Sequence, residues 1–302
     1  MQPSMRYMVT VALIVALGGF LMGFDASVIS GVVGFIETEF SLTKIQVGWS
    51  VSSLALMATF AMMVSGPVSD RIGRRPVLRI AALLFGISAI ASAVAPNFTW
   101  LVLARMLGGL GVGAALIIAP MYIAEMAPPK SRGKLVSFNQ LNIVIGISAA
   151  FFSNYLILTL GESGGAWADA LRFGEWNWRW MLGVETLPAV LYLVALLFVP
   201  ESPRWLAMQG RDDEARAILA KVSGEAQADA DLRAVRESIE AEQELADLSF
   251  RALLHPSLRL VLTIGLAVGI LQQITGINSV FFYAPMIFEP VSYTHLRAHE
   301  TR

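Results

Sequence analysis

Long apolar stretches separated by short polar loops dominate the pattern of this chain. A helix that crosses the hydrocarbon core of a bilayer needs about 20 mostly apolar residues. Seven stretches meet that criterion: 7–31, 47–68, 77–96, 99–123, 135–160, 178–199 and 258–289. The first is too long for a secretory signal, lacks a small-residue cleavage pattern and contains Asp25, which favours a retained helix. The pattern therefore predicts an all-α membrane protein.

One region departs from this pattern. Residues 200–257 hold 7 basic and 12 acidic side chains, which is 19 of the 45 charged residues of the chain. Between these charges, apolar residues recur at helical spacing, as in Ala215, Ile218, Leu219 and Val222. We therefore predict amphipathic helices in the aqueous phase, and we interpret most of their charges as a solvated surface.

The composition narrows the class of protein. Of 302 residues, 56% are hydrophobic and 15% are charged, with a mean hydropathy of +0.63. Soluble domains are about 45–50% apolar and about 25% charged, which excludes a soluble enzyme. The chain has no cysteine, and its formal net charge of −1 argues against a nucleic-acid partner. The spans contain no nucleophile–base pair and no metal-ligand set, so we expect neither an enzyme, nor a cofactor, nor a metal site.

Loop charge predicts the orientation. The loops after the second and fourth spans carry seven basic residues: Arg71, Arg74, Arg75, Arg79, Lys130, Arg132 and Lys134. The short loops on the other side offer only Lys44 and Arg172. By the positive-inside rule, the N-terminus and residues 201–257 are expected in the cytoplasm.

The start of the seventh span repeats features of the first. A shift of 253 residues without gaps places Gly23 on Gly276 and Asp25 on Asn278. Transporters are often built from such duplicated halves, so we expect the seventh span to open a second copy of the unit that the first span begins.

Five motifs are more specific than composition. They are 23–31 (GFDASVISG), 66–75 (GPVSDRIGRR), 120–133 (PMYIAEMAPPKSRG), 200–206 (PESPRWL) and 272–278 (QQITGIN). In this order and spacing they resemble the sugar porter family of the major facilitator superfamily. Segments 137–140 (SFNQ) and 178–181 (WRWM) are similar to its bacterial proton-coupled xylose and hexose symporters.

The resemblance implies a fold and a domain organisation. We expect residues 1–200 to form a complete N-terminal six-helix bundle, 201–257 a cytoplasmic helical linker, and 258–290 the first helix of the C-terminal bundle. We interpret residues 291–302, which turn abruptly polar, as a non-native tail. A two-half transporter with this repeat needs roughly 450–460 residues, so we expect a truncated chain that is inactive alone.

A buried acid is the first candidate site. An ionised carboxylate inside a span is costly and usually functional, and Asp25 lies in the middle of the first span. Arg105 is expected to be the only other charge well inside a span, and to pair with Asp25. Protonation of Asp25 would weaken such a pair and free the helices to move. The resemblance implies that Asp25 couples transport to protons; the alternative is a static ion pair.

Side-chain amides form the second candidate site. Gln140, Gln272, Gln273 and Asn278 can both donate and accept hydrogen bonds, which suits sugar hydroxyls. The resemblance places sugar contacts at these four positions and an outer gate at Phe282 and Tyr283. It also implies an aromatic residue where this chain has Met22, so the substrate-binding set departs from the family there. The alternative for any single amide is a hydrogen bond between helices.

A third set of charges lies at the cytoplasmic ends of the predicted helices. We expect these residues to pair into a lock that favours the outward-facing state. The set is Asp70, Arg71, Arg74, Arg75, Glu125, Arg132, Glu201 and Arg204. Orientation signals alone would explain the arginines but not Asp70, Glu125 and Glu201.

Taken together, these features predict proton-coupled symport of a xylose- or glucose-like monosaccharide across the bacterial cytoplasmic membrane by alternating access. An uncoupled facilitative sugar transporter and a transporter-like sugar sensor are the alternatives. The expected partners are the sugar, protons and the lipid bilayer.

Overall fold

The computed structural model describes residues 3–128, 131–162, 165–246, 258–277, 279–280, 282–283 and 287. Within these ranges every regular element is a helix. The end of the expected linker (247–257), Asn278 and the expected non-native tail lie outside the described residues.

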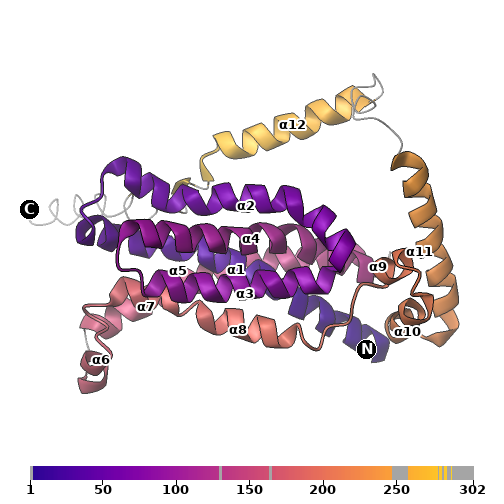
Figure 1. Cartoon of the computed structure of the whole chain (residues 1–302), viewed down its shortest axis with the longest axis horizontal. Helices are drawn as coiled ribbons and strands as arrows, with labels where there is room; N and C mark the ends of the chain where they lie inside the picture. The colour runs from indigo at the N-terminus through magenta and orange to yellow at the C-terminus, as the bar shows by residue number, and fades with distance from the viewer. Residues whose placement is uncertain are drawn as a thin grey trace, which may run out of the picture.

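Five long helices form the body of the molecule and lie alongside one another (Figure 1). They are α1 (Pro3–Glu39), α2 (Lys44–Ile72), α3 (Arg74–Ala93), α4 (Phe98–Met126) and α5 (Arg132–Glu162). Each is long and apolar enough to cross a membrane. They overlap the first five predicted spans, although the third helix ends at Ala93, before the predicted residue 96. Short capping sequences start two of them: Thr43 and Gln46 form a capping box at α2, and the Asn97 side chain accepts the N–H of Trp100 at α4.

The sixth predicted span, expected as one helix over 178–199, is two helices. These are α7 (Asn177–Gly183) and α8 (Thr186–Ala195), and a short helix, α6 (Ala166–Ala170), precedes them. Pro188 explains the break, because a proline has no N–H and its ring displaces the carbonyl four residues earlier. That carbonyl belongs to Val184, and it accepts the N–H of Leu187 instead.

Glycines set the closest helix contacts. A Cβ placed on Gly23 would lie 2.1 Å from the carbonyl oxygen of Ile143, and one on Gly146 would lie 2.1 Å from that of Phe20. The backbones of α1 and α5 therefore touch at two reciprocal points. Gly113 of α4 approaches the carbonyl oxygen of Ala58 of α2 in the same way. Small residues allow such close packing where lipid removes the hydrophobic drive.

Three further helices cover one end of the bundle: α9 (Pro203–Met208), α10 (Asp212–Ser223) and α11 (Glu225–Ala246). Figure 1 shows them at the end where α1 begins. The last described helix, α12 (Arg259–Ile274), has no buried residue and lies apart from the bundle. After it, the chain passes through Gly276 with a φ of +69°, a left-handed conformation that glycine adopts readily.

Candidate functional site

The two charges expected to pair inside the bundle do lie together. Arg105 of α4 donates to Asp25 of α1 over 3.1 Å between Nη1 and Oδ1, and also to the Asp25 carbonyl oxygen over 3.4 Å. The two side chains are only 2% and 4% exposed, respectively. Close packing of α1 and α4 thus holds an ion pair away from water.

A third ionisable group joins this pair, which corrects the expectation that Arg105 is the only other charge inside a span. Glu185 lies at the junction of α7 and α8, is 3% exposed, and interacts electrostatically with both Asp25 and Arg105. One atom of each group, Oδ2 of Asp25, Nε of Arg105 and Oε1 of Glu185, is buried without a hydrogen-bond partner among the described residues. We call these three residues the buried charge cluster. The sequence signal was an acid inside the apolar run 181–199, three residues before Pro188.

The arrangement leaves the cluster chemically adjustable. The cluster contains one guanidinium and two carboxylates, so it carries either a net negative charge or one additional proton. The backbone at Gly108 packs closely against it, since a Cβ there would lie 3.2 Å from Oδ2 of Asp25 and 2.5 Å from the Ser88 hydroxyl. A buried group set of this kind can hold and release a proton as its surroundings change.

The predicted amide site is not assembled among the described residues. Gln140 of α5, like Gln272 and Gln273 of α12, is exposed, while Met22 is half-buried against the apolar core. No residue of α12 is buried, so this helix does not bring its amides to α5. Asn278 lies outside the described residues. Phe282 and Tyr283, the expected gate, are half-buried against the apolar cluster that contains Phe24 and Val28 of α1.

The centre of the cytoplasmic charge set is a buried arginine. Arg74, 4% exposed, lies 2.8 Å from a carboxylate oxygen of Asp70 and 3.0 Å from one of Glu125. Glu201 accepts the backbone N–H groups of Arg74 and Arg75 over 3.1 and 3.2 Å. Burial raises the pKa of the Glu201 carboxyl above its ordinary value, although these hydrogen bonds act in the opposite direction.

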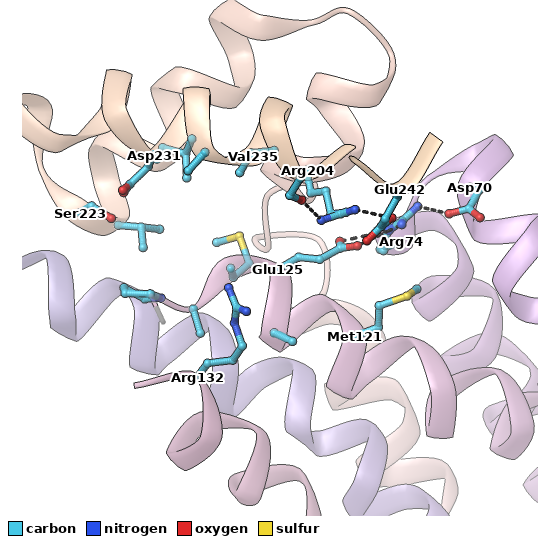
Figure 2. A pocket seen from close by; sticks show the side chains of 18 residues that line it. Asp70, Arg74, Met121, Glu125, Arg132, Arg204, Ser223, Asp231, Val235 and Glu242 are labelled. Carbon is cyan, nitrogen blue, oxygen red and sulfur yellow. Dashed lines mark hydrogen bonds and ion pairs between the residues drawn. The ribbon is translucent and has the colours of Figure 1, made fainter. Parts of the chain in front are cut away.

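The remaining members pair differently from the prediction. Arg75 donates to the carbonyl oxygen of Leu197, and Arg204 pairs with Glu242 of α11 over 2.6 Å. Arg71 and Arg132 are exposed. Arg132 lines a cavity of about 580 Å³ together with Arg74, Glu125 and Arg204. The cavity lies between the bundle and helices α10 and α11 (Figure 2).

Sequence reasoning missed three polar members of this region. The Ser202 hydroxyl donates to Glu125, while Ser238 and Glu242 both accept from Arg204. Ser202 is part of a recognised motif, but Ser238 and Glu242 lie in a helix whose charges had been read as a solvated surface. The structure therefore extends this set of charged and polar contacts to α11.

Comparison with known proteins places the chain in a family. The family model described as "Sugar (and other) transporter" matches residues 11–298, a range that runs into the segment read as a non-native tail. The arabinose-proton symporter of Bacillus subtilis is 39% identical over 96% of this chain and 60% of its own length. The galactose-proton symporter of Escherichia coli is 38% identical over 94% of this chain and 58% of its own length.

A solved structure agrees. The proton:xylose symporter XylE, of the major facilitator superfamily, superposes with a TM-score of 0.81 at 36% identity, over 94% of this chain and 63% of its own. The chain thus spans about three fifths of the relatives that it matches. Its all-helical fold and its family agree with the expectation from the motifs, and these relatives are transporters rather than enzymes. The chain belongs to the sugar transporter family of the major facilitator superfamily.

Proposed function

We propose that this chain provides the proton-coupling half of a transporter that takes up a monosaccharide together with protons by alternating access. The observation that carries the proposal is the buried charge cluster, in which Arg105 pairs with Asp25 and a second buried carboxylate, Glu185, lies within their electrostatic influence. The arabinose- and galactose-proton symporters among the relatives support proton coupling as the class of mechanism.

The cluster couples three segments of the bundle. Asp25 belongs to α1, Arg105 to α4, and Glu185 to the break between α7 and α8. When Asp25 is ionised, its pair with Arg105 holds α1 against α4. When a proton neutralises Asp25, Arg105 turns toward Glu185, and the hold on α1 weakens. Uptake of the proton thereby favours a different arrangement of the helices.

Sugar recognition is proposed for Gln140, Gln272, Gln273 and Asn278, with Met22 beside them and Phe282 and Tyr283 as the gate. A xylose- or glucose-like substrate offers the hydroxyls that amides bind. The charge set around Arg74 is proposed to stabilise the outward-facing state. The basic loops after α2 and α4 support a cytoplasmic location for the N-terminus and α9–α11 in a bacterium.

The experiment exchanges the aligned segment of the Bacillus subtilis arabinose-proton symporter for this chain, so that the relative supplies the rest of the transporter. The chimaera with Asp25 is the reference and should accumulate sugar when a proton gradient is applied to proteoliposomes. Asp25→Asn should keep counterflow of labelled sugar and lose this accumulation. Accumulation against the gradient by Asp25→Asn would contradict the proposal, and equal rates with and without the proton gradient in the reference would favour a facilitative transporter.

A further inference from the structure

The segment between α5 and α7 carries more aromatic surface than a solvated loop requires. Trp167 is 56% exposed, Leu171 45% and Trp176 46%. Trp167 and Leu171 are four residues apart on and just after α6, so they share one face. Asp169, two residues from each, points to the other side of the helix.

The segment is nevertheless fixed to the bundle. Ala168 and Phe173 are buried in the apolar cluster that also contains Trp178. The ring of Phe173 lies 5.1 Å from that of Trp180 and 6.0 Å from that of Trp167. Trp180 also donates its indole N–H to the carbonyl oxygen of Leu171 over 2.9 Å. The exposed aromatic face is thus held in place rather than left to collapse onto the bundle.

Its position matches the edge of a bilayer. Figure 1 shows α6 at the end of the bundle where α2 begins, on the side where α7 and α8 lie. Six of the seven tryptophans lie toward this end. Four of them are in residues 167–180, and Trp49 and Trp100 fall within the first two turns of α2 and α4. The seventh, Trp205, is in α9 at the other end. Trp49 and Trp100 are 42% and 49% exposed. Tryptophans gather at the level of lipid headgroups, so they mark the interface at this end.

Helix α8, on the same side of the bundle (Figure 1), also presents an apolar surface. The outward side chains of α8 are apolar and exposed, including Leu187 at 65% and Leu191 at 58%. Arg172, which follows α6, places its guanidinium 5.4 Å from the centre of the Trp176 ring. A cation stacked on an interfacial tryptophan is suited to lipid phosphate, which lies at the same depth.

We propose that residues 165–176 form an interfacial anchor that lies flat on the bilayer, with Trp167, Leu171 and Trp176 inserted among the headgroups and Asp169 turned to water. Its partner is the lipid surface itself. The assignment of the anchor to the extracytoplasmic leaflet rests on the orientation given under the proposed function, and the anchor itself does not. The anchor fixes the depth of α7, and through α7 the height of the break that carries Glu185.

Spin labelling tests this directly, because the chain has no cysteine of its own. Single cysteines are introduced as Trp167→Cys, Leu171→Cys and Asp169→Cys, so that each variant keeps at least two of the three anchoring side chains. Leu191→Cys in α8 is the lipid-exposed control and Ala226→Cys in α11 the aqueous control. The 302-residue chain is placed in phosphatidylglycerol–phosphatidylcholine nanodiscs, and collisions of each label with oxygen and with a water-soluble nickel chelate are measured.

The expected result is an alternating pattern. Labels at positions 167 and 171 should show an oxygen-to-nickel ratio several-fold above that at Ala226→Cys and below that at Leu191→Cys. The label at position 169 should resemble the aqueous control. If positions 167 and 171 match the aqueous control, the face is in water and the anchor is refuted; a label inaccessible to both reagents would mean a protein contact and refute it equally.

The leaflet is tested separately from transport. A membrane-impermeant thiol reagent added outside intact cells should modify Asp169→Cys and spare Ala226→Cys. The reverse result would overturn the assigned leaflet and orientation but not the anchor. Loss of sugar accumulation plays no part in either measurement, so failure of the anchor and failure of the proposed function remain distinguishable.

Discussion

At the scale of single residues, the buried charge cluster is where the molecule departs most from an apolar interior. Asp25 and Arg105 would be costly alone, and together they offset part of the loss of water. Glu185 makes the balance asymmetric, because it adds a second carboxylate to one guanidinium. The single observed pair, Arg105 with Asp25, therefore leaves one buried carboxylate without a counter-ion of its own among the described residues.

Removal of the cation should expose this balance. Arg105→Met leaves two buried carboxylates without a counter-ion, and we expect a loss of about 3–5 kcal/mol of unfolding free energy. The double variant Arg105→Met/Asp25→Asn should recover part of that loss, because a single carboxylate remains. Thermal unfolding of the four members of this mutant cycle in detergent measures the coupling. Strictly additive effects would show that Asp25 and Arg105 do not interact.

The sequence predicted that Asp25 and Arg105 lie together, because a charge within an apolar span is costly unless an opposite charge pairs with it. It overlooked Glu185, since that acid sits near the middle of a run that otherwise reads as a uniform span. It predicted the amides of α12 as a group, but their arrangement depends on how α12 packs against the bundle, and no residue of α12 is buried. Periodicity predicts which face of a helix a residue occupies, but it does not predict which other helix packs against that face.

At the scale of helices, backbone contact decides how the bundle is built. Gly23 and Gly146 let α1 and α5 touch at carbonyl oxygens, so no side chain separates the two helices there. The two helices should consequently move as one body. In the motif 23–31, the sequence points to Asp25 as the functional residue. The structure shows that the first glycine, Gly23, also has a role, because it allows α1 to pack against α5.

Gly146→Ala should separate α1 from α5. The added methyl would lie 2.1 Å from the carbonyl oxygen of Phe20, which is backbone and cannot swing aside. We expect a loss of about 2 kcal/mol or more, the upper part of the range for overpacked sites. Gly34→Ala is the matched control, because nothing lies within 4 Å of a Cβ at that position of α1. Equal thermal stability of the two variants in detergent would contradict a backbone contact in solution.

The break in the sixth span belongs to this scale as well. Length and hydropathy predicted one helix over 178–199, and Pro188 divided it after Gly183. The proline was visible in the sequence, but proline within an apolar run is compatible with an unbroken helix, as Pro67 and Pro120 show in α2 and α4. The local sequence alone does not separate these outcomes.

At the scale of the whole molecule, the charges around Arg74 connect the bundle to helices α9 and α11. Arg74 begins α3, Glu125 ends α4, Glu201 precedes α9, and Arg204 extends the connection to α11 through Glu242 (Figure 2). The motifs predicted that these helix ends converge. The extension to α11 could not be predicted, because its partners lie among many similar charges.

This connection should respond to pH through Glu201. Since burial raises its pKa above the ordinary value of 4.5, the folded protein keeps the proton to a higher pH than the unfolded chain does. Stability should therefore fall as pH rises from 4.5 through the raised pKa. Glu201→Gln keeps the hydrogen-bond acceptor and removes the titration, so its thermal stability should lack this decline. Parallel pH profiles of the two proteins would show that Glu201 does not titrate in that range.

The turn at Gly73 gives this connection an uneven sensitivity to mutation. Its φ of +100° directs the N–H groups of Arg74 and Arg75 to Glu201, and a Cβ at Gly73 would lie 2.5 Å from a Glu201 oxygen. The donors to this acid, at positions 74, 75 and 202, are main-chain N–H groups, which every amino acid except proline would supply. Substitutions at positions 74 and 75 can therefore remove the guanidinium contacts while the main-chain hydrogen bonds to Glu201 remain. A methyl group at position 73, by contrast, would weaken the hydrogen bonds to Glu201 directly, because it would crowd the carboxylate.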